Sequence, residues 1–174
     1  NAPAIHARYP GGTLPPGATV DGADPARIAL DAVQRTVSIP VGMALDPGGM
    51  GKGLAADLVV VELLAGGAAG ALCCIGGDLS MAGRPPAPDG WFIAVERPDP
   101  ADGTLVTLAV SGGGVATSSA RSRRWMHAGT EQHHLIDPRT GRAAQTDLAA
   151  VTVIARSGWQ AEAHATAALL RGGD

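Results

Sequence analysis

The feature that most constrains this chain is a glycine-rich loop that runs directly into an apolar helical pattern. Four of the eight residues from Asp46 to Gly53 are glycine, and the loop also holds Lys52, the only lysine in the chain. Glycine leaves backbone N–H groups uncovered, and a helix start carries partial positive charge, so such a loop suits a phosphate group. It is not a Walker A loop, because Gly53 stands where Ser or Thr is required, and its glycine spacing does not fit the dinucleotide fingerprint. An ordinary strand-to-helix turn therefore remains the alternative.

The composition indicates one folded domain whose core is built from small aliphatic side chains. Of the 174 residues, 45% are hydrophobic but only 3% are aromatic, so Ala, Val, Leu and Ile must fill the interior. The formal net charge of −3 argues against a general nucleic-acid binder. No stretch is long and apolar enough to span a membrane. Residues 1–26 are interpreted as a loop-rich leader without signal-peptide features, and residues 27–174 as the domain.

The hydrophobic pattern predicts two helices and a series of short strands. The first helix is expected from Gly51 to Leu64, ending before two glycines, and the second from Gly158 to Arg171. The first should pack through one side made of Ala55, Leu58, Val59, Glu62 and Leu63. We expect a hairpin over 27–40, strands at 43–46, 70–75, 79–83, 91–96, 104–110, 115–119 and 148–155, a mobile loop at about 120–131, and a β-turn over 137–141. Cys73 and Cys74 share one strand, so they point to opposite faces, and we expect two buried, unbridged thiols.

Two further segments carry side chains that suit catalysis or metal binding. His133 and His134 are neighbours on a strand, so only one can enter a given site, and the turn after them would hold His134 at a pocket mouth. Glu162 and Thr166 lie one helical turn apart, where both can reach one hard cation such as Mg²⁺. Each has an ordinary alternative: a hydrogen-bonded or exposed histidine, an exposed glutamate and a core threonine.

Three aspartates also have ordinary interpretations when each is taken alone. Asp46 and Asp78 fit turn positions, and Asp57 fits the exposed surface of the first helix.

The order of these segments resembles the ApbE family of flavin transferases, the FAD:protein FMN transferases. The resemblance covers about residues 27–171, and its matching stretches are 46–57, Gly76-Gly77-Asp78, Ala116-Thr117-Ser118, 134–141, 151–155 and 161–166. It implies an α/β fold of the α+β type, with a largely antiparallel sheet and few packing helices, related to the T-fold. It also implies that the family's N-terminal part is missing from this chain, which does not begin with Met and is expected to be a processed or truncated product.

The resemblance further implies which residues form the site. His134 would be a general base. Contacts to FAD are expected from Asp46, Lys52, Thr117, Ser118 and Ile136. Mg²⁺ would be held by the backbone carbonyl of Gly49 and by the side chains of Glu162 and Thr166. Two positions depart from the family pattern, because Glu162 replaces an aspartate and Ala165 stands at an optional ligand position.

The reaction implied by the resemblance is Mg-dependent transfer of FMN from FAD to a Thr or Ser hydroxyl of a target flavoprotein, with release of AMP. Two alternatives stay open: a Mg-dependent FAD pyrophosphatase that yields FMN and AMP, and a flavin-binding fragment without catalysis. The implied partner is a flavin-accepting protein, whereas no nucleic acid and no membrane span is expected. The sequence predicts neither the oligomeric state nor the cellular compartment. The resemblance suggests a membrane-associated or extracytoplasmic localisation.

Overall fold

The chain divides into two compact units. The computed structural model describes residues 25–41, 43, 46–98, 103–121, 123–127, 129–138 and 140–173. Unit 1 comprises Asn1–Asp46 and Arg124–Ala144, and unit 2 comprises Pro47–Arg123 and Gln145–Asp174. Because residues 1–24 lie outside the described part, the leader expected at residues 1–26 stays a prediction.

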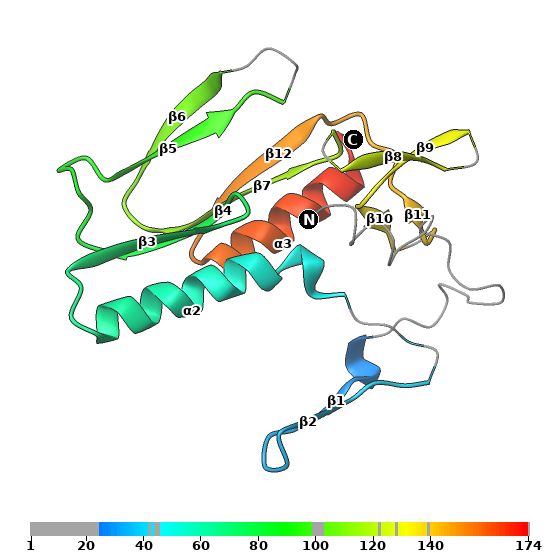
Figure 1. Cartoon of the computed structure of the whole chain (residues 1–174), viewed down its shortest axis with the longest axis horizontal. Helices are drawn as coiled ribbons and strands as arrows, with labels where there is room; N and C mark the ends of the chain where they lie inside the picture. The colour runs from blue at the N-terminus through cyan, green and yellow to red at the C-terminus, as the bar shows by residue number, and fades with distance from the viewer. Residues whose placement is uncertain are drawn as a thin grey trace. The chain divides into compact units, whose positions relative to one another are not determined.

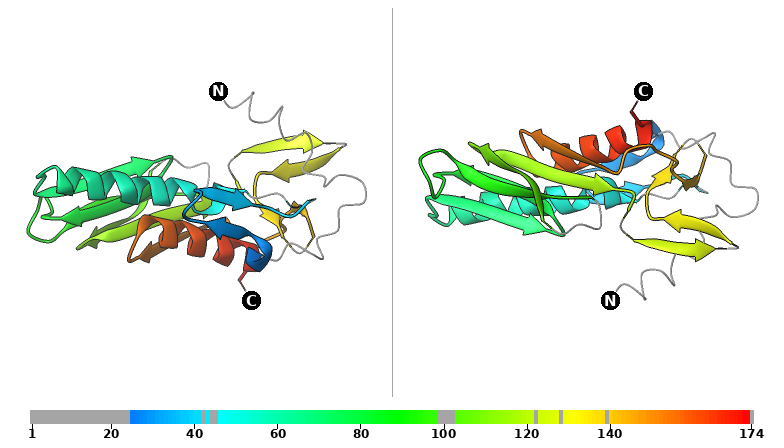
Figure 2. Two further views of the ribbon diagram at one scale, coloured as in Figure 1. Left: turned by 90° about the horizontal axis from the view of Figure 1, so that it is seen from below. Right: turned by 90° about the horizontal axis from the view of Figure 1, so that it is seen from above.

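Unit 2 contains a four-stranded antiparallel sheet with two α-helices on one face. The strand order is β12-β7-β4-β3, and both helices pack on the same side of the sheet, as Figures 1 and 2 show. The strands are β3 (Gly70–Ile75), β4 (Asp78–Gly83), β7 (Gly113–Ser119) and β12 (Ala150–Ala155). The helices are α2 (Gly51–Ala65), which follows a short 3-10 turn, η3 (Pro47–Gly49), and α3 (Gly158–Arg171). The expected α+β fold with an antiparallel sheet is therefore confirmed, and both helices lie within one residue of their predicted bounds.

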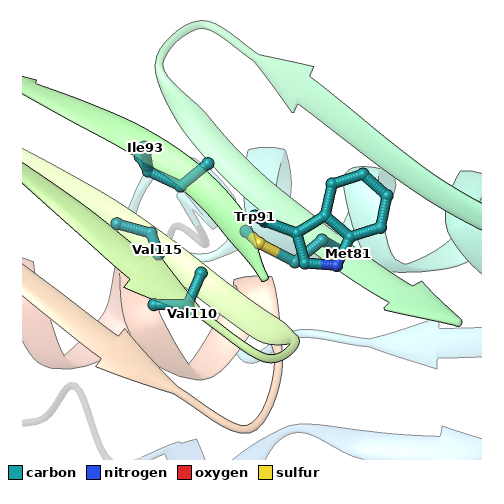
Figure 3. Packing of buried hydrophobic residues seen from close by; sticks show 5 residues of the cluster. All are labelled: Met81, Trp91, Ile93, Val110 and Val115. Atoms are coloured by element: carbon teal, nitrogen blue, oxygen red, sulfur yellow. The ribbon is translucent and has the colours of Figure 1, made fainter. Parts of the chain in front are cut away.

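The two faces of the sheet have different partners because successive strand residues point to opposite sides. On one face, β4 and β7 meet the helices. On the other face, Met81 and Val115 join the hairpin of β5 (Trp91–Glu96) and β6 (Thr104–Val110). Figure 3 shows this core cluster, which consists of Met81, Trp91, Ile93, Val110 and Val115. One side of the sheet is thus covered by the hairpin, and the other side is covered by the two helices.

The helices approach each other and the sheet closely at glycine positions. A Cβ atom on Gly53 would lie 2.3 Å from the carbonyl carbon and oxygen of Gly158, and one on Gly114 would lie 2.3 Å from those of Ser157. The buried residues of α2 are Gly53, Ala56 and Val60. The expected packing side of this helix is therefore wrong. Because α2 is apolar nearly all round, close approach at Gly53, and not hydrophobic periodicity, determines which side is buried.

Unit 1 consists of short hairpins. The β1 (Ala29–Asp31) and β2 (Thr36–Ser38) pair confirms the hairpin expected over 27–40. The predicted strand at 43–46 falls partly outside the described residues, and Met43 and Asp46 themselves are not in a strand. The remaining strands are β8 (Arg124–His127), β9 (Thr130–His133), β10 (Ile136–Asp137) and β11 (Arg142–Ala143).

Two local predictions in unit 1 have opposite outcomes. The mobile loop expected at about 120–131 is wrong, because β8 and β9 pair there, and Nη1 of Arg124 donates to both carboxylate oxygens of Glu131 at 3.1 Å. The turn over 137–141 is confirmed, since the carbonyl of Asp137 accepts the N–H groups of Thr140 at 3.1 Å and Gly141 at 2.8 Å.

The two thiols are unbridged, as expected, but they are not both buried. Cys73 is half-buried and Cys74 is exposed. They belong to β3, which is an edge strand of the sheet, so one of its faces receives little cover. In the part of the chain that the structure describes, no helix combines the length and the apolar character needed to cross a bilayer.

The contact between Gly53 and Gly158 gives a testable prediction. We expect Gly53→Ala to lower the free energy of unfolding by about 2 kcal/mol or more, because the added methyl group meets backbone that cannot rotate away. Gly51→Ala is the matched control in the same helix, since its Cβ would lie 3.6 Å from Cβ of Pro47, an ordinary contact. This control should be neutral or stabilising by up to about 1 kcal/mol. Urea denaturation measures both, and equal effects would contradict the close packing.

Candidate functional site

Two carboxylates and one ammonium group meet at the start of α2. Lys52, in the first turn of this helix, forms ion pairs with Asp78 at the start of β4 and with Glu162 in α3. Asp78 and Glu162 are only 3% and 2% exposed, whereas the Lys52 side chain is 34% exposed. A lysine ammonium has three N–H donors, and the carboxylates take two of them. One donor therefore remains for a ligand on the open side of the group.

The glycine turn before β4 shapes this group. Gly76 and Gly77 have φ values of 59° and 94°, which L-residues with a side chain rarely adopt. A Cβ on Gly76 would lie 3.2 Å from Cδ of Lys52, so the turn packs against the stem of the lysine. Asp78 follows at once as the first residue of β4. The sequence Gly-Gly-Asp thus brings a carboxylate to Lys52 while leaving room for its aliphatic stem.

Glu162 and Asp57 each cap the helix to which the other belongs. The second oxygen of Glu162, in α3, accepts the N–H of Gly53 in the first turn of α2 at 2.8 Å. Asp57, in α2, accepts the N–H groups of Gly158 at 2.7 Å and Trp159 at 3.0 Å at the start of α3. A helix start carries unsatisfied N–H groups and partial positive charge, so carboxylates stabilise it. The residues at the two N-cap positions make no side-chain capping bond of their own.

The charges of the Lys52 group shift the pKa values of its members. Burial lowers the pKa of Lys52, but its hydrogen bonds to Asp78 and Glu162 and their negative charges outweigh this effect, so the pKa lies above its ordinary value of 10.5. Burial raises the pKa of the Asp78 carboxyl above 3.8, and the charge of Glu162 adds to this, while Lys52 and a backbone hydrogen bond from Thr117 oppose it. The raised pKa of Lys52 favours its charged form, whereas the raised pKa of Asp78 favours its neutral form. Because two carboxylates share one ammonium, Lys52 stays charged and one carboxylate is less than fully compensated.

The three residues expected to hold Mg²⁺ all belong to unit 2. Glu162 and Thr166 lie one turn apart on α3, and a Cβ on Gly49 would lie 3.8 Å from Cγ2 of Thr166. Their carbonyl, hydroxyl and carboxylate oxygens are the hard donors that Mg²⁺ prefers. The Lys52 ammonium already compensates the carboxylate of Glu162, so Mg²⁺ would share this carboxylate with the ammonium or displace it. The residues present therefore fit Mg²⁺ in donor type.

Other donors near this position are limited. Thr166 Oγ1 pairs with Ser118 Oγ at 2.9 Å. Ala165, at the optional ligand position, is fully buried against the core. Among the residues that the structure describes, no group of three or more His, Cys, Asp and Glu side chains could hold a metal ion. A metal site here would depend on backbone and hydroxyl oxygens beside Glu162.

Thr117 and Ser118, both expected to contact FAD, point to opposite faces of β7. Ser118 meets α3 through Thr166, whereas Oγ1 of Thr117 pairs with Oγ1 of Thr152 at 2.8 Å on the other face. Only the side chain of Ser118 therefore lies on the helix side of the sheet. Thr117 reaches the Lys52 group through its backbone, by the hydrogen bond to Asp78.

In unit 1, the structure gives the two neighbouring histidines different positions. His133 is buried, its Nδ1 accepts the N–H of Leu135 at 3.3 Å, and its Nε2 donates to the carbonyl of Ala144 at 2.8 Å. Both ring nitrogens of His133 thus bind backbone groups, so its role here is structural. The role of His134 as a general base stays a prediction. Ile136 is 38% exposed on β10. Asp46, His134 and Ile136 belong to unit 1, and their meeting with the unit 2 residues at one site stays a prediction.

Sequence reasoning missed the partners of two aspartates. Asp78 is not merely a turn residue, because it pairs with Lys52, and Asp57 is not merely a helix-surface residue, because it caps α3. The Gly-Gly-Asp turn placed directly before a strand was the available signal for Asp78. No local signal marked Asp57, since its partners are about a hundred residues away.

Sequence comparisons connect the chain with flavin transferases. The model of the ApbE family matches residues 10–174. The FAD:protein FMN transferase of Salmonella typhimurium is 30% identical over 124 residues, which are 71% of this chain and 35% of that protein. The FAD:protein FMN transferase of Treponema pallidum is 31% identical over 159 residues, which are 84% of this chain and 43% of that protein.

Solved structures show the same fold. The ApbE protein of Thermotoga maritima matches with a TM-score of 0.73 at 29% identity, over 83% of this chain and 47% of that one. The apo form of Pseudomonas stutzeri flavinyl transferase ApbE matches with a TM-score of 0.67 at 32% identity, over 85% of this chain and 45% of that one. The chain thus spans less than half the length of each of these relatives.

The raised pKa of Lys52 predicts how stability depends on alkaline pH. A lysine whose pKa is higher in the folded than in the unfolded protein contributes stability that is complete below pH 10.5 and is lost as pH rises through the folded value. We expect the free energy of unfolding to fall over this range. Lys52→Arg is the control, because arginine keeps its charge there and should give a smaller slope. Urea denaturation between about pH 9 and 12 measures it, and equal slopes would mean that Lys52 is not held by charge.

Proposed function

The chain belongs to the ApbE family, and we propose that its Lys52 group takes part in Mg-dependent transfer of FMN from FAD to a Thr or Ser hydroxyl of a target flavoprotein, with release of AMP. This proposal is supported by the family membership and by the relatives named FAD:protein FMN transferase.

The observation that carries the proposal is that a single lysine is held in place while one of its donors stays available. Asp78 and Glu162 fix the ammonium of Lys52, and its partly exposed side chain can offer the remaining N–H to a phosphate oxygen. The group stands at the start of α2, where helix N–H groups also favour an anion. A pyrophosphate needs N–H donors and positive charge. The lysine, the helix start and the glycine loop together offer both.

The charge of the group supplies a reason for metal dependence. Two carboxylates and one ammonium leave a net charge of minus one, which repels a pyrophosphate. Gly49, Glu162 and Thr166 would hold Mg²⁺, and the bound metal would reverse this net charge and polarise the pyrophosphate oxygens. The residues of the chain then hold the substrate: Lys52 and Ser118 at the phosphates, and Asp46 and Ile136 at the rest of the nucleotide.

The proposed step forms one bond to phosphorus and breaks one. The acceptor hydroxyl oxygen attacks the FMN phosphorus of FAD, the phosphorus–oxygen bond to AMP breaks, and AMP leaves. His134 would take the proton of the attacking hydroxyl, since an imidazole titrates near neutral pH. Phosphoryl transfer needs positioning and charge compensation more than covalent help from the protein, which matches the kinds of residue present.

Incubation with FAD, Mg²⁺ and peptides that carry a central Thr or Ser tests the proposal directly. We expect peptide mass to increase by one FMN and an equal amount of AMP to appear in the same reaction. Mass spectrometry and nucleotide chromatography measure the two products. FMN and AMP without a peptide adduct would support the pyrophosphatase instead, and FAD binding without either product would support a flavin-binding fragment.

His134→Ala and His133→Gln form the matched pair of variants for this assay. His134→Ala should lower the transfer rate at least about 100-fold and leave FAD affinity within about twofold, because the base acts on the acceptor. His133→Gln should chiefly lower stability, since His133 binds backbone groups. Near-normal transfer by His134→Ala would overturn its assignment as the base.

The proposed metal ligand gives a separate prediction. Glu162→Gln should weaken Mg²⁺ binding about tenfold or more, because an amide lacks the charge that attracts the ion. Calorimetric titration with Mg²⁺ measures this without any turnover. Glu62→Gln, on the exposed side of α2, is the control and should leave Mg²⁺ binding unchanged. Equal Mg²⁺ affinities of Glu162→Gln and the unchanged chain would remove Glu162 from the ligand set.

A further inference from the structure

Asp78 is the member of the Lys52 group for which neither the family resemblance nor the proposed reaction supplies a role. We propose that Asp78 is a positioning residue: it holds the Lys52 ammonium beside the start of α2, and it keeps it there when Glu162 binds a metal ion. The second half of this inference rests on the proposed function, whereas the first half does not.

The setting of Asp78 makes it a fixed support. It is the first residue of β4, an inner strand of the sheet, and it is 3% exposed. Its carboxylate also receives a hydrogen bond from the Thr117 backbone on the neighbouring strand β7. A buried carboxylate with partners on two other elements has little freedom to move. The position of the Lys52 ammonium is therefore fixed by the sheet as well as by its own helix.

The stem of Lys52 is restrained from the same side. Gly76, two residues before Asp78, lies next to Cδ of the lysine. The turn thus confines the aliphatic chain while the following aspartate binds its end. A free lysine samples many rotamers, and losing that freedom on binding a ligand costs affinity. A lysine that is already held loses less when a phosphate arrives.

Glu162 cannot hold the Lys52 ammonium in place alone, because it also has other partners. One of its oxygens caps α2 at Gly53, and the other meets Lys52. If a divalent cation binds the oxygen that faces Lys52, the cation also repels the ammonium. Without Asp78, Lys52 would then turn toward solvent. With Asp78 in place, the ammonium keeps a buried negative partner and stays at the start of α2.

The single lysine of the chain makes the inference directly measurable. Acetylation by an N-hydroxysuccinimide ester, followed by mass spectrometry of the peptide that contains Lys52, reports its availability with no other lysine in the background. We expect Asp78→Asn to raise the acetylation rate at least about fivefold, because the lysine loses a charged hydrogen-bond partner. Adding Mg²⁺ should change the rate little in the unchanged chain and raise it further in Asp78→Asn. Asp78→Glu, which keeps the charge, should restore part of the protection.

Asp57→Asn is the matched control for a merely structural effect. Asp57 is also a carboxylate that binds across elements, but it contacts the start of α3 and not Lys52. It should lower stability while leaving the acetylation rate of Lys52 in the folded protein unchanged. A folded Asp78→Asn variant that is acetylated at the rate of the unchanged chain would overturn the proposal, as would an equal increase in Asp57→Asn.

A second measurement covers the case in which Asp78→Asn does not fold. The unchanged chain, labelled with ¹⁵N-lysine, should give one ammonium signal that remains visible at neutral pH, because held protons exchange slowly with water. Absence of this signal would contradict a held lysine. All of these measurements work without FAD, so a failure of FAD binding would count against the proposed function and leave the role of Asp78 to be decided by labelling.

Discussion

The structure depends on an exchange of carboxylates between two helices. Glu162 of α3 satisfies the start of α2, and Asp57 of α2 satisfies the start of α3. Each helix start has N–H groups that need acceptors, and neither N-cap side chain supplies one. The exchange is possible only because Gly53 and Gly158 let the two helices approach at their first turns. The same contact that joins the helices therefore places Lys52 next to Glu162.

The contacts that stabilise the helices and the proposed chemistry thus share one set of atoms. Burying a carboxylate is costly unless hydrogen bonds and opposite charge compensate for it, and Glu162 has both, from Gly53 and Lys52. Its two oxygens bind a backbone N–H group and a side chain of α2 at the same time. This carboxylate reaches both the backbone of α2 at Gly53 and the ammonium of Lys52. A change at this position would alter the helix packing together with the proposed site.

Sequence reasoning succeeded where the signal was local. The end of α2 before Gly66, the turn after Asp137 and the hairpin at β1 and β2 each follow from a few adjacent residues. It failed where the outcome depends on distant partners. The buried side of α2 is set by a glycine contact with α3, and Cys74 is exposed because β3 lies at the edge of the sheet. The resemblance implies that Lys52 and Glu162 are site residues, which stays a prediction, and it does not indicate that they bind each other.

The charge of the Lys52 group makes the proposed binding of metal and nucleotide interdependent. Two buried carboxylates against one ammonium favour a cation and disfavour a pyrophosphate. A divalent cation at Glu162 would reverse this preference, and a bound pyrophosphate would in turn strengthen the attraction for the metal. By thermodynamic linkage, each ligand then raises the affinity for the other by the same factor. The surplus negative charge attracts the metal, and the helix start beside it attracts an anion. This arrangement therefore suits the proposed binding of nucleotide and metal together.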